Sequence, residues 1–254
     1  MKRPWIVTVQ LFIVVAFFAS WEFGARNGVI NPEWFSPPAA VVARLFNELA
    51  AGTLMAHVST TTLETLAGFI AGVVGGVALG IVLGLMDRLR EILMPYLMAI
   101  YGIPRPALAP IFVLWFGIGI FSKVMLIFSL VYFLIVIYVI AGYAAVSPSL
   151  VDFARTNGAS RRQILSKIVI PSVLPYIFAG MKLGIGLAIV GAVVGEIIAS
   201  REGLGYYIFQ ASQRADLEGI YVGLAALGVV SLALVFALEW TDRRLFHWRR
   251  EVVL

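Results

Sequence analysis

Residues able to do nucleophilic or metal chemistry are scarce in this chain of 254 residues. It has no cysteine and only two histidines, His57 and His247. The lack of cysteine excludes thiolate nucleophiles, Cys-bound metals, iron–sulfur clusters and disulfides, and two distant histidines make no imidazole cluster. The sequence also has no Gly-x-x-x-x-Gly-Lys-Ser/Thr segment to hold ATP phosphates. We therefore expect no catalytic residues, metal site or cofactor in this chain.

The more informative ionisable residues lie inside long apolar runs. Arg105 and Lys182 lie within such runs, whereas Glu64 and Glu196 lie nearer their ends. Because a charge in the membrane interior is costly, such residues mark either a solute path or a structural pair. Arg105 and Lys182 could each receive an anionic solute, pair with a carboxylate, or extend to the interface. Glu196 could support an outer gate, and capping or interface solvation is the simpler interpretation of Glu64.

The elements that position these residues follow from composition. Hydrophobic residues make up 61% of the chain, and its mean hydropathy is +0.96. A soluble domain of this length could not bury that share, and a disordered chain would need more polar residues. Each membrane span needs about 20 residues. Six runs of this kind are present, at about 5–23, 58–86, 92–116, 121–146, 171–200 and 220–240. We expect an all-α polytopic membrane protein with six transmembrane helices.

Basic residues set the predicted orientation. With both termini inside, twelve of the nineteen Lys and Arg residues are cytoplasmic, five are outside, and Arg105 and Lys182 lie within spans. This asymmetry follows the positive-inside rule, so both termini and the loop 147–170 are predicted to be cytoplasmic. The inner residues are Lys2, Arg3, Arg88, Arg90, Arg155, Arg161, Arg162, Lys167, Arg243, Arg244, Arg249 and Arg250, and the outer ones are Arg26, Arg44, Lys123, Arg201 and Arg214.

The first run has two interpretations. It could be a signal peptide, but it lacks a convincing small-x-small cleavage site, so a retained span is favoured. Between this run and the next, residues 39–51 have the pattern of a short amphipathic helix. We place that helix at the outer membrane interface.

Glycines and prolines interrupt the side-chain pattern of two runs. In the second run glycines recur at 68, 72, 76, 80 and 84. A strip without side chains lets a neighbouring helix approach closely, either as a sliding surface or as a tight static interface. In the third run Pro104, Pro106 and Pro110 remove three backbone donors, so that helix must be interrupted. It forms either a wall of the translocation path or a kinked helix buried among its neighbours.

The polar loop after the fourth run has the signals of a folded element. Ser147 can cap a helix that has Pro148 at its first position, and Gly158 supplies a left-handed stop. Ser160 and Gln163 have the spacing of a capping box that opens a second short helix. We therefore expect a helix–turn–helix with a basic outer face. That face could instead bind anionic lipid.

This loop resembles the EAA loop of ABC transporter permeases. The matching residues are Asp152-Phe153-Ala154, Gly158 and Ile168-Val169-Ile170-Pro171, with the spacing kept. Asp152 and Phe153 replace the family's Glu and first Ala, and Ile170 replaces Leu. Five further segments are similar to the branch that imports sulfonates, taurine, nitrate and bicarbonate, namely 66–69, 110–119, 154–160, 194–197 and 203–206. The resemblance covers about residues 58–242.

The resemblance implies a type I importer permease in the bacterial inner membrane. Its partners would be a second permease copy, two cytoplasmic ATPase subunits that bind ATP and Mg²⁺, an extracytoplasmic solute-binding protein, and membrane lipid, but not nucleic acid. The branch carries sulfonates, nitrate, bicarbonate, aromatic carboxylates and some neutral or cationic vitamin precursors, and within this range Arg105 and Lys182 favour a small anion. We expect the chain to be divided into three segments. Residues 1–57 hold the first span and the outer interfacial segment, residues 58–242 form the permease core with the coupling loop 147–170, and residues 243–254 form a basic tail.

Two groups of site residues follow from the resemblance and the membrane pattern. The ATPase-coupling group is Asp152, Ala154, Arg155, Gly158, Ala159, Ser160, Arg161, Arg162 and Gln163. The group expected to line the translocation path or its gate is Pro104, Arg105, Pro106, Pro110, Lys182 and Glu196. The coupling group would transmit ATP-driven closure of the partner subunits to the helices.

Two other function classes remain as alternatives. An ion-driven secondary carrier would need intramembrane carboxylates to power itself, and these are few and peripheral here, without an obvious inverted repeat. An intramembrane enzyme would need a catalytic set of residues at helical spacing within a span, and none is evident. Both are less favoured than a permease.

Overall fold

The computed structural model describes residues 4–31 and 34–245, and every regular element in these ranges is helical. Five helices are long and apolar enough to cross a membrane, and one bent helix pair brings the number to as many as six. The predicted all-α polytopic architecture is therefore confirmed. Lys2, Arg3, Arg249 and Arg250, together with the predicted tail beyond residue 245, lie outside the described residues.

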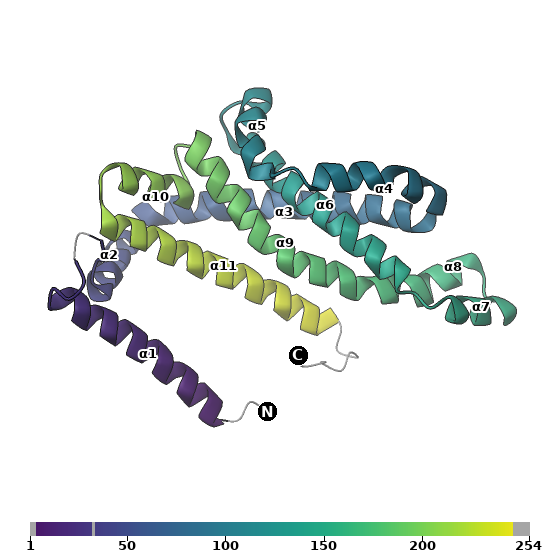
Figure 1. The fold of residues 1–254 in the computed structure, drawn as a ribbon, viewed down its shortest axis with the longest axis horizontal. Helices are drawn as coiled ribbons and strands as arrows, with labels where there is room; N and C mark the ends of the chain where they lie inside the picture. Colours follow the sequence, from purple (N-terminus) through teal and green to yellow (C-terminus); the bar gives the residue numbers. More distant parts are fainter. Residues whose placement is uncertain (1–3, 32–33, 246–254) are drawn as a thin grey trace. The chain divides into compact units, whose positions relative to one another are not determined.

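The helices follow the predicted runs closely (Figure 1). In order they are α1 (Pro4–Arg26), α2 (Pro38–Ala50), α3 (Thr53–Leu85), α4 (Asp87–Tyr101), η1 (Arg105–Leu108), α5 (Ala109–Phe116), α6 (Ile120–Ala144), α7 (Pro148–Thr156), α8 (Arg161–Ile164), η2 (Leu165–Val169), α9 (Ile170–Ala199), α10 (Leu204–Gln213) and α11 (Leu217–Leu245). The chain forms two compact units, a first unit of residues 1–60 with 202–228 and a second unit of residues 61–201 with 229–254.

Helix α6 is the centre of the second unit, where twelve of its 25 residues are buried. The glycine strip of α3 lies against it, and a Cβ added at any of the five glycines would lie 2.5 to 2.9 Å from an α6 side chain. The facing residues also recur every fourth position, as Ile127, Val131, Ile135, Val139 and Tyr143. Because both series ascend together, α3 and α6 run parallel with their backbones in close approach.

Helix α9 packs against α6 in the opposite direction, and Figure 1 shows the two side by side. Gly180 of α9 meets Tyr138, and Gly195 meets Lys123, so the numbers descend along α6 as they ascend along α9. The core of the second unit therefore consists of α6 held between two glycine-bearing helices. The buried side chains along this contact include Ile127, Val131, Ile135, Ala188 and Ala192.

The third apolar run is broken, as its prolines predict. Helix α4 and the segment η1–α5 meet at 77°. Pro106 and Pro110 lie in the first turns of η1 and α5, and Pro104 precedes η1. A missing N–H costs little at these positions, because the first donors of a helix have no partner within it.

The short helix after Ser160 is present as α8, and Pro171 lies in the first turn of α9 as predicted. No pattern in the sequence indicated that the two helices join without a gap, but residues 161–199 form one continuous helical run. A five-residue π-helix, η2, joins α8 to α9. Pro171 lies in the first turn of α9, where it removes one donor without ending the helix, and Ser172 Oγ donates to the carbonyl of Ile168 at 2.7 Å.

The first unit contains α1, α2, α10 and the beginning of α11. The predicted amphipathic helix is present as α2. It is tied to α1 by the backbone N–H of Ala39, which donates to Glu22 Oε2 at 2.9 Å. Nearby, the ring of Trp21 lies 5.5 Å from that of Tyr221 and 6.5 Å from that of Phe35. Aromatic contacts therefore join the end of α1 to α11.

Candidate functional site

The loop between α6 and α9 is folded, and Gly158 forms its central turn. Gly158 has φ +81° and follows the last residues of α7. Its N–H donates to the carbonyl of Arg155 at 3.0 Å, and that of Ala159 donates to the carbonyl of Ala154 at 3.0 Å. These two bonds make a Schellman motif, in which the residue after the helix adopts the left-handed conformation. The predicted glycine stop is confirmed.

The second predicted cap is also present, but the first is not. Gln163 N–H donates to Ser160 Oγ at 3.3 Å, and Ser160 N–H donates to Gln163 Oε1 at 2.8 Å, which is a full capping box. Ser147 precedes α7 but its side chain caps nothing. Its hydroxyl shares a 2.7 Å hydrogen bond with that of Ser149 instead. At the first position of α7, Pro148 has a fixed φ that suits a helix start.

The loop packs onto the core on one side and is open on the other. Ala154 and Ala159 are half-buried against the hydrophobic core of the second unit, and Ile164 is buried in it. The remaining residues of the predicted coupling group are exposed, namely Asp152, Arg155, Gly158, Ser160, Arg161, Arg162 and Gln163. The structure thus brings this group together in one element with a polar, mainly basic open face.

A hollow of about 310 Å³ lies in this element. Its lining residues come from the end of α7, the Gly158 turn, α8 and η2, and they are Ala154, Asn157, Gly158, Ala159, Gln163, Ile164, Lys167 and Ile168. The hollow therefore adjoins the π-helical joint as well as the predicted coupling residues.

Two exposed apolar side chains of this element were missed by sequence reasoning. Phe153 is 67% exposed and Leu150 is 48% exposed, both on α7. Large apolar side chains that project into water commonly mark an interaction surface when they are grouped. The signal was available in the sequence, because Phe153 and Leu150 are three apart on a short helix and so lie on one face.

Arg105 is buried beside the helix break and makes local contacts. Its guanidinium donates to the carbonyls of Ile100 at 3.0 Å and of Tyr101 at 3.3 Å, the last two residues of α4. The same group lies 4.6 Å from the ring centroid of Phe133 on α6. Arg105 thus caps the carbonyls at the end of α4, as basic side chains commonly do at helix C-termini. Its predicted role in a solute path stays a prediction.

Lys182 forms an ion pair that sequence reasoning did not identify. Its Nζ lies 2.6 Å from Oδ2 of Asp242, so α9 and α11 are joined within the second unit. The two side chains are 41% and 22% exposed. The two residues are 60 positions apart in the chain, and no local sequence pattern indicated the pair. The role of Lys182 in the path also stays a prediction.

A buried polar cluster joins three helices of the second unit. Lys123 of α6 forms an ion pair with Glu64 of α3 and donates to Ser200 Oγ at 2.8 Å. Nearby, Glu196 of α9 is fully buried and accepts a 2.7 Å hydrogen bond from Thr61 Oγ1. Sequence reasoning counted Lys123 among the outer basic residues, and that side of the membrane stays a prediction. It interpreted Glu64 as a capping or interface-solvated residue, and solvation is wrong because the Glu64 side chain is only 1% exposed. The apolar run was expected to begin at 121, and Lys123 lies one turn into α6.

In the first unit, the segment around Gly203 is held by α3. The Gly203 N–H donates to Nδ1 of His57 at 3.1 Å, and Thr60 Oγ1 donates to Glu202 Oε2 at 3.3 Å. Gly203 has φ +110°, which favours glycine at the start of α10. Sequence reasoning gave His57 no role.

The predicted gating role of Glu196, which lies in the buried cluster of the second unit, stays a prediction.

Comparisons with known proteins agree on one family. A model described as "Binding-protein-dependent transport system inner membrane component" matches residues 72–250. The riboflavin transport system permease protein RibX of Chloroflexus aurantiacus is 34% identical over 94% of this chain and 88% of its own. The taurine transport system permease protein TauC of Escherichia coli is 29% identical, and the match covers 97% of this chain and 91% of TauC.

A solved structure of the MetNI methionine ABC transporter, in an inward-facing conformation, has a similar fold. The TM-score is 0.66 at 19% identity, over 75% of this chain and 95% of that one. The fold is therefore that of a type I importer permease, as the loop resemblance implied. The chain belongs to the family of binding-protein-dependent transport system inner membrane components, as a multi-pass permease subunit of the cytoplasmic membrane whose ATP hydrolysis lies in separate ATPase subunits.

Proposed function

We propose that this permease forms the translocation path for a small anionic solute delivered by a solute-binding protein. Residues 152–167 couple that path to two cytoplasmic ATPase subunits, which bind ATP and Mg²⁺. The anion is of the sulfonate, nitrate, bicarbonate or aromatic carboxylate type. A homodimer of the chain encloses the path, and both termini and the loop 147–170 face the cytoplasm.

The observation that carries the coupling role is the rigidity and openness of the 147–170 loop. The Schellman motif at Gly158 and the capping box at Ser160 fix its shape, and Ile164 anchors it in the core. Its open face presents the apolar side chains Leu150 and Phe153 beside charged residues. A rigid protrusion with an apolar centre and a polar rim is suited to a protein groove.

The continuous helix after the loop gives a route for the motion. Because α8, η2 and α9 form one helical run, a displacement of the loop is passed directly to α9. Helix α9 in turn packs along α6, and α6 packs against the glycine strip of α3. The π-helical turn η2 lies where the loop joins α9, and π-helical turns are frequent at functional sites.

The path residues are proposed from position and charge. Pro104, Pro106 and Pro110 keep the helix broken at η1 and α5, while Arg105 contributes the positive charge there. Lys182 and Glu196 line or gate the path from α9. Support for an anion comes from Arg105, two of whose N–H groups are engaged by carbonyls while a guanidinium has five. The relative named for taurine transport agrees with this preference.

The test is uptake by the permease reconstituted in proteoliposomes with its ATPase subunits and its binding protein. We expect uptake that needs ATP inside and is competed by sulfonates or carboxylates but not by neutral analogues. Arg105→Gln should lower the uptake of the anion about tenfold or more, and Arg105→Lys should retain more of it. Equal uptake by all three proteins would contradict the role of Arg105 in the path. Uptake by this chain alone, driven by a proton gradient, would favour the secondary carrier.

A further inference from the structure

Helix α2 points its charged side chains toward the first unit and several large apolar side chains away from it. Its charged side chains, Arg44 and Glu48, point into the first unit and are only 31% and 20% exposed. Val41 is buried on the same side as these charged residues, whereas the apolar side chains Val42, Phe46 and Leu49 point outward and are 49%, 66% and 37% exposed. A helix on a water-exposed surface shows the opposite arrangement. The outward face of α2 is therefore built for apolar surroundings.

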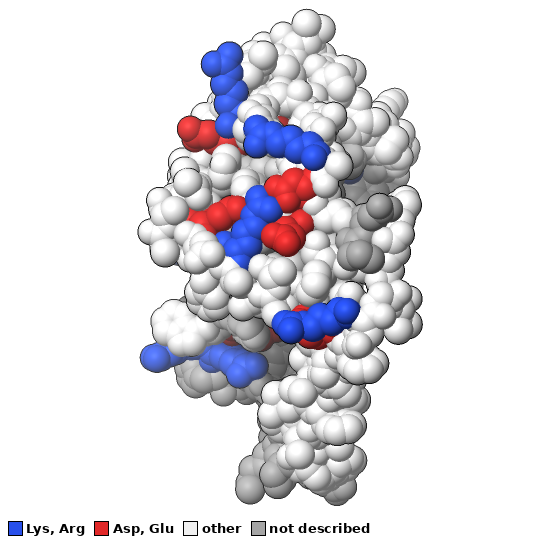
Figure 2. Space-filling view, turned by 90° about the vertical axis from the view of Figure 1, so that its left-hand side faces the viewer, with Lys and Arg blue, Asp and Glu red and all other residues white. Residues whose placement is uncertain are grey.

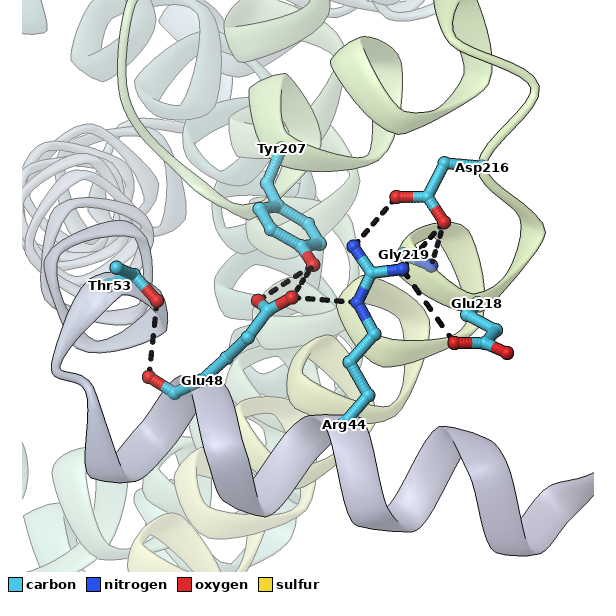
Figure 3. A network of polar contacts seen from close by, with 7 residues as sticks. All are labelled: Arg44, Glu48, Thr53, Tyr207, Asp216, Glu218 and Gly219. Atoms are coloured by element: carbon cyan, nitrogen blue, oxygen red, sulfur yellow. Dashed lines mark hydrogen bonds and ion pairs between the residues drawn. The ribbon is translucent and has the colours of Figure 1, made fainter.

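A network of polar contacts fixes this orientation (Figure 3). Arg44 donates two parallel hydrogen bonds to the Asp216 carboxylate, from Nη1 to Oδ1 at 2.6 Å and from Nη2 to Oδ2 at 2.7 Å. Arg44 Nε also donates to Glu48 Oε1 at 2.8 Å, and the hydroxyl of Tyr207 donates to Glu48 Oε2 at 2.8 Å. Rotating α2 about its axis would break all of these bonds. Bidentate Arg–carboxylate contacts of this kind fix geometry as well as supply energy.

The network also joins α2 to the beginning of α11. Asp216 precedes α11, and its Oδ1 accepts from the N–H of Gly219 at 3.1 Å. The Arg44 guanidinium is the main cause that holds the pKa of Asp216 below its ordinary value, so the pair is charged at neutral pH. Through Tyr207 the same network reaches α10. Any surface that holds α2 therefore also positions the α10–α11 corner.

The position of α2 in the chain places it at a membrane surface. It lies in the connection between α1 and α3, both of which can span a membrane. Helix α1, to which it is hydrogen bonded through Ala39, presents exposed apolar side chains such as Phe12, which is 72% exposed. Trp34, four residues before α2, is 69% exposed, and tryptophan favours the membrane–water interface. The outward face of α2 is thus apolar, like the exposed side chains of the spanning helix to which it is hydrogen bonded.

Charges on this side of the molecule are interspersed. Figure 2 looks at the left-hand side of Figure 1, where α2 and α10 lie, and shows Lys and Arg side chains next to Asp and Glu side chains. A docking surface for a strongly charged partner would carry one sign in excess. The exposed apolar side chains of α1 also need a covering, and a second copy seated on α2 alone would not provide it. Lipid covers both helices.

We propose that α2 is an interfacial helix whose Val42, Phe46 and Leu49 lie in the lipid of one membrane leaflet, and that the Arg44–Asp216 contact makes it an anchor for the α10–α11 corner. An amphipathic helix of this type lies in the plane of the membrane, with its apolar face at the boundary of headgroups and acyl chains. The depth of α10 and of the start of α11 is then set by lipid contacts of α2.

The lack of native cysteine makes a direct test simple. Single-cysteine variants carry an environment-sensitive fluorophore at residue 46, with residue 42 as a second position one turn away. The full chain is placed in lipid nanodiscs that contain nitroxide lipids, labelled either near the headgroup or deep in the acyl chain. Phe12→Cys in α1 is the control for the bilayer interior, and the exposed Ser212→Cys in α10 is the control for water.

The proposal predicts that probes at 42 and 46 are quenched at least twofold more by shallow nitroxide lipids than by aqueous iodide. The probe at 12 should respond most to deep nitroxides, and that at 212 to iodide. In the Phe46→Cys protein, adding Asp216→Asn should weaken the lipid quenching, because α2 is released. Iodide quenching at 42 and 46 equal to that at 212 would overturn the proposal. The proposal would also be overturned if probes at 42 and 46 were protected from both nitroxide lipids and iodide, and if cysteines at 46 cross-linked two copies of the chain. That result would show that the outward face of α2 is a dimer interface.

Discussion

Lys123 and Glu64 form an ion pair in the interior of the second unit, with side chains only 5% and 1% exposed. The pair joins α6 to α3, and the same ammonium group donates to Ser200 at the end of α9. A buried pair of this kind adds little net stability as a whole, because desolvation offsets the attraction. Removing one partner is different, since the other is left charged and unpaired in an apolar interior.

We therefore expect Lys123→Met to destabilise the protein by about 3–5 kcal/mol. The double variant Lys123→Met with Glu64→Gln should recover a large part of that loss, because no charge then remains unpaired. The measurement is thermal unfolding in detergent followed by tryptophan fluorescence. Lys182→Met is the matched control, because its pair with Asp242 is far more exposed and should be worth about 0–1 kcal/mol. Equal losses in the two lysine variants would refute the distinction.

The glycine strip of α3 offers a second prediction. At Gly76 a Cβ would lie 2.7 Å from both the Tyr132 carbonyl oxygen and the Ile135 Cβ, so Gly76→Ala must push α3 away from α6. We expect a loss of about 1–3 kcal/mol, as for other overpacked sites. At Gly186 of α9 a Cβ meets no atom within 4 Å, and Gly186→Ala should be neutral or slightly stabilising. A stable Gly76→Ala protein would show that the close approach is not required.

The Arg44–Asp216 contact predicts a dependence on pH. Because the Arg44 hydrogen bond lowers the pKa of Asp216 in the folded protein, the pair contributes fully above the pKa of an unfolded aspartate, about 3.9. That contribution is lost as the pH falls through the lower folded-state pKa. The stability difference between wild type and Asp216→Asn should thus be constant from pH 7 to 5 and shrink below about pH 4. A difference that stays unchanged down to pH 2.5 would contradict this assignment.

The two serines before α7 and α8 give a matched pair of variants. Ser160→Ala removes the capping box and should cost about 1 kcal/mol of local stability. Ser147→Ala removes a hydroxyl that caps no helix, so it should lower the local stability by at most about 0.5 kcal/mol. Amide hydrogen exchange over residues 161–164 is the suitable measurement, with faster exchange in Ser160→Ala alone. Equal exchange in both variants would mean that tertiary packing, and not the cap, holds α8.

The elements that were predictable from sequence are those with local causes. The six apolar runs, the break at Pro104 to Pro110 and the cap at Gly158 each depend on residues close together in the chain. Backbone chemistry of this kind needs no tertiary information, since a missing donor or a positive φ acts on its own helix.

The tertiary pairs could not be predicted. Lys123 shows no buried partner in the sequence until Glu64 is placed beside it, and Lys182 has its carboxylate 60 residues away. The inward face of α2 is a further example, because its pattern shows two faces but not which one meets water. The partner of Arg44, Asp216, is 172 residues distant. Contacts between residues this far apart in the chain leave no local pattern in the sequence.

The central claim is that the 147–170 loop transmits the action of the ATPase subunits. Gly158 and Gly52 make a matched pair for testing it, because they have φ +81° and +75° and a Cβ at either meets no atom within 4 Å. Leucine at either position strains the backbone by about 1–2 kcal/mol without disturbing the packing of the chain. Only at 158 does the added side chain project into the proposed contact with the ATPase.

The decisive measurement is solute taken up per ATP hydrolysed by the complete transporter in proteoliposomes, compared for wild type, Gly158→Leu and Gly52→Leu. We predict that Gly158→Leu lowers this ratio at least tenfold while Gly52→Leu stays close to wild type. A ratio for Gly158→Leu equal to that of Gly52→Leu would contradict the coupling role of the loop.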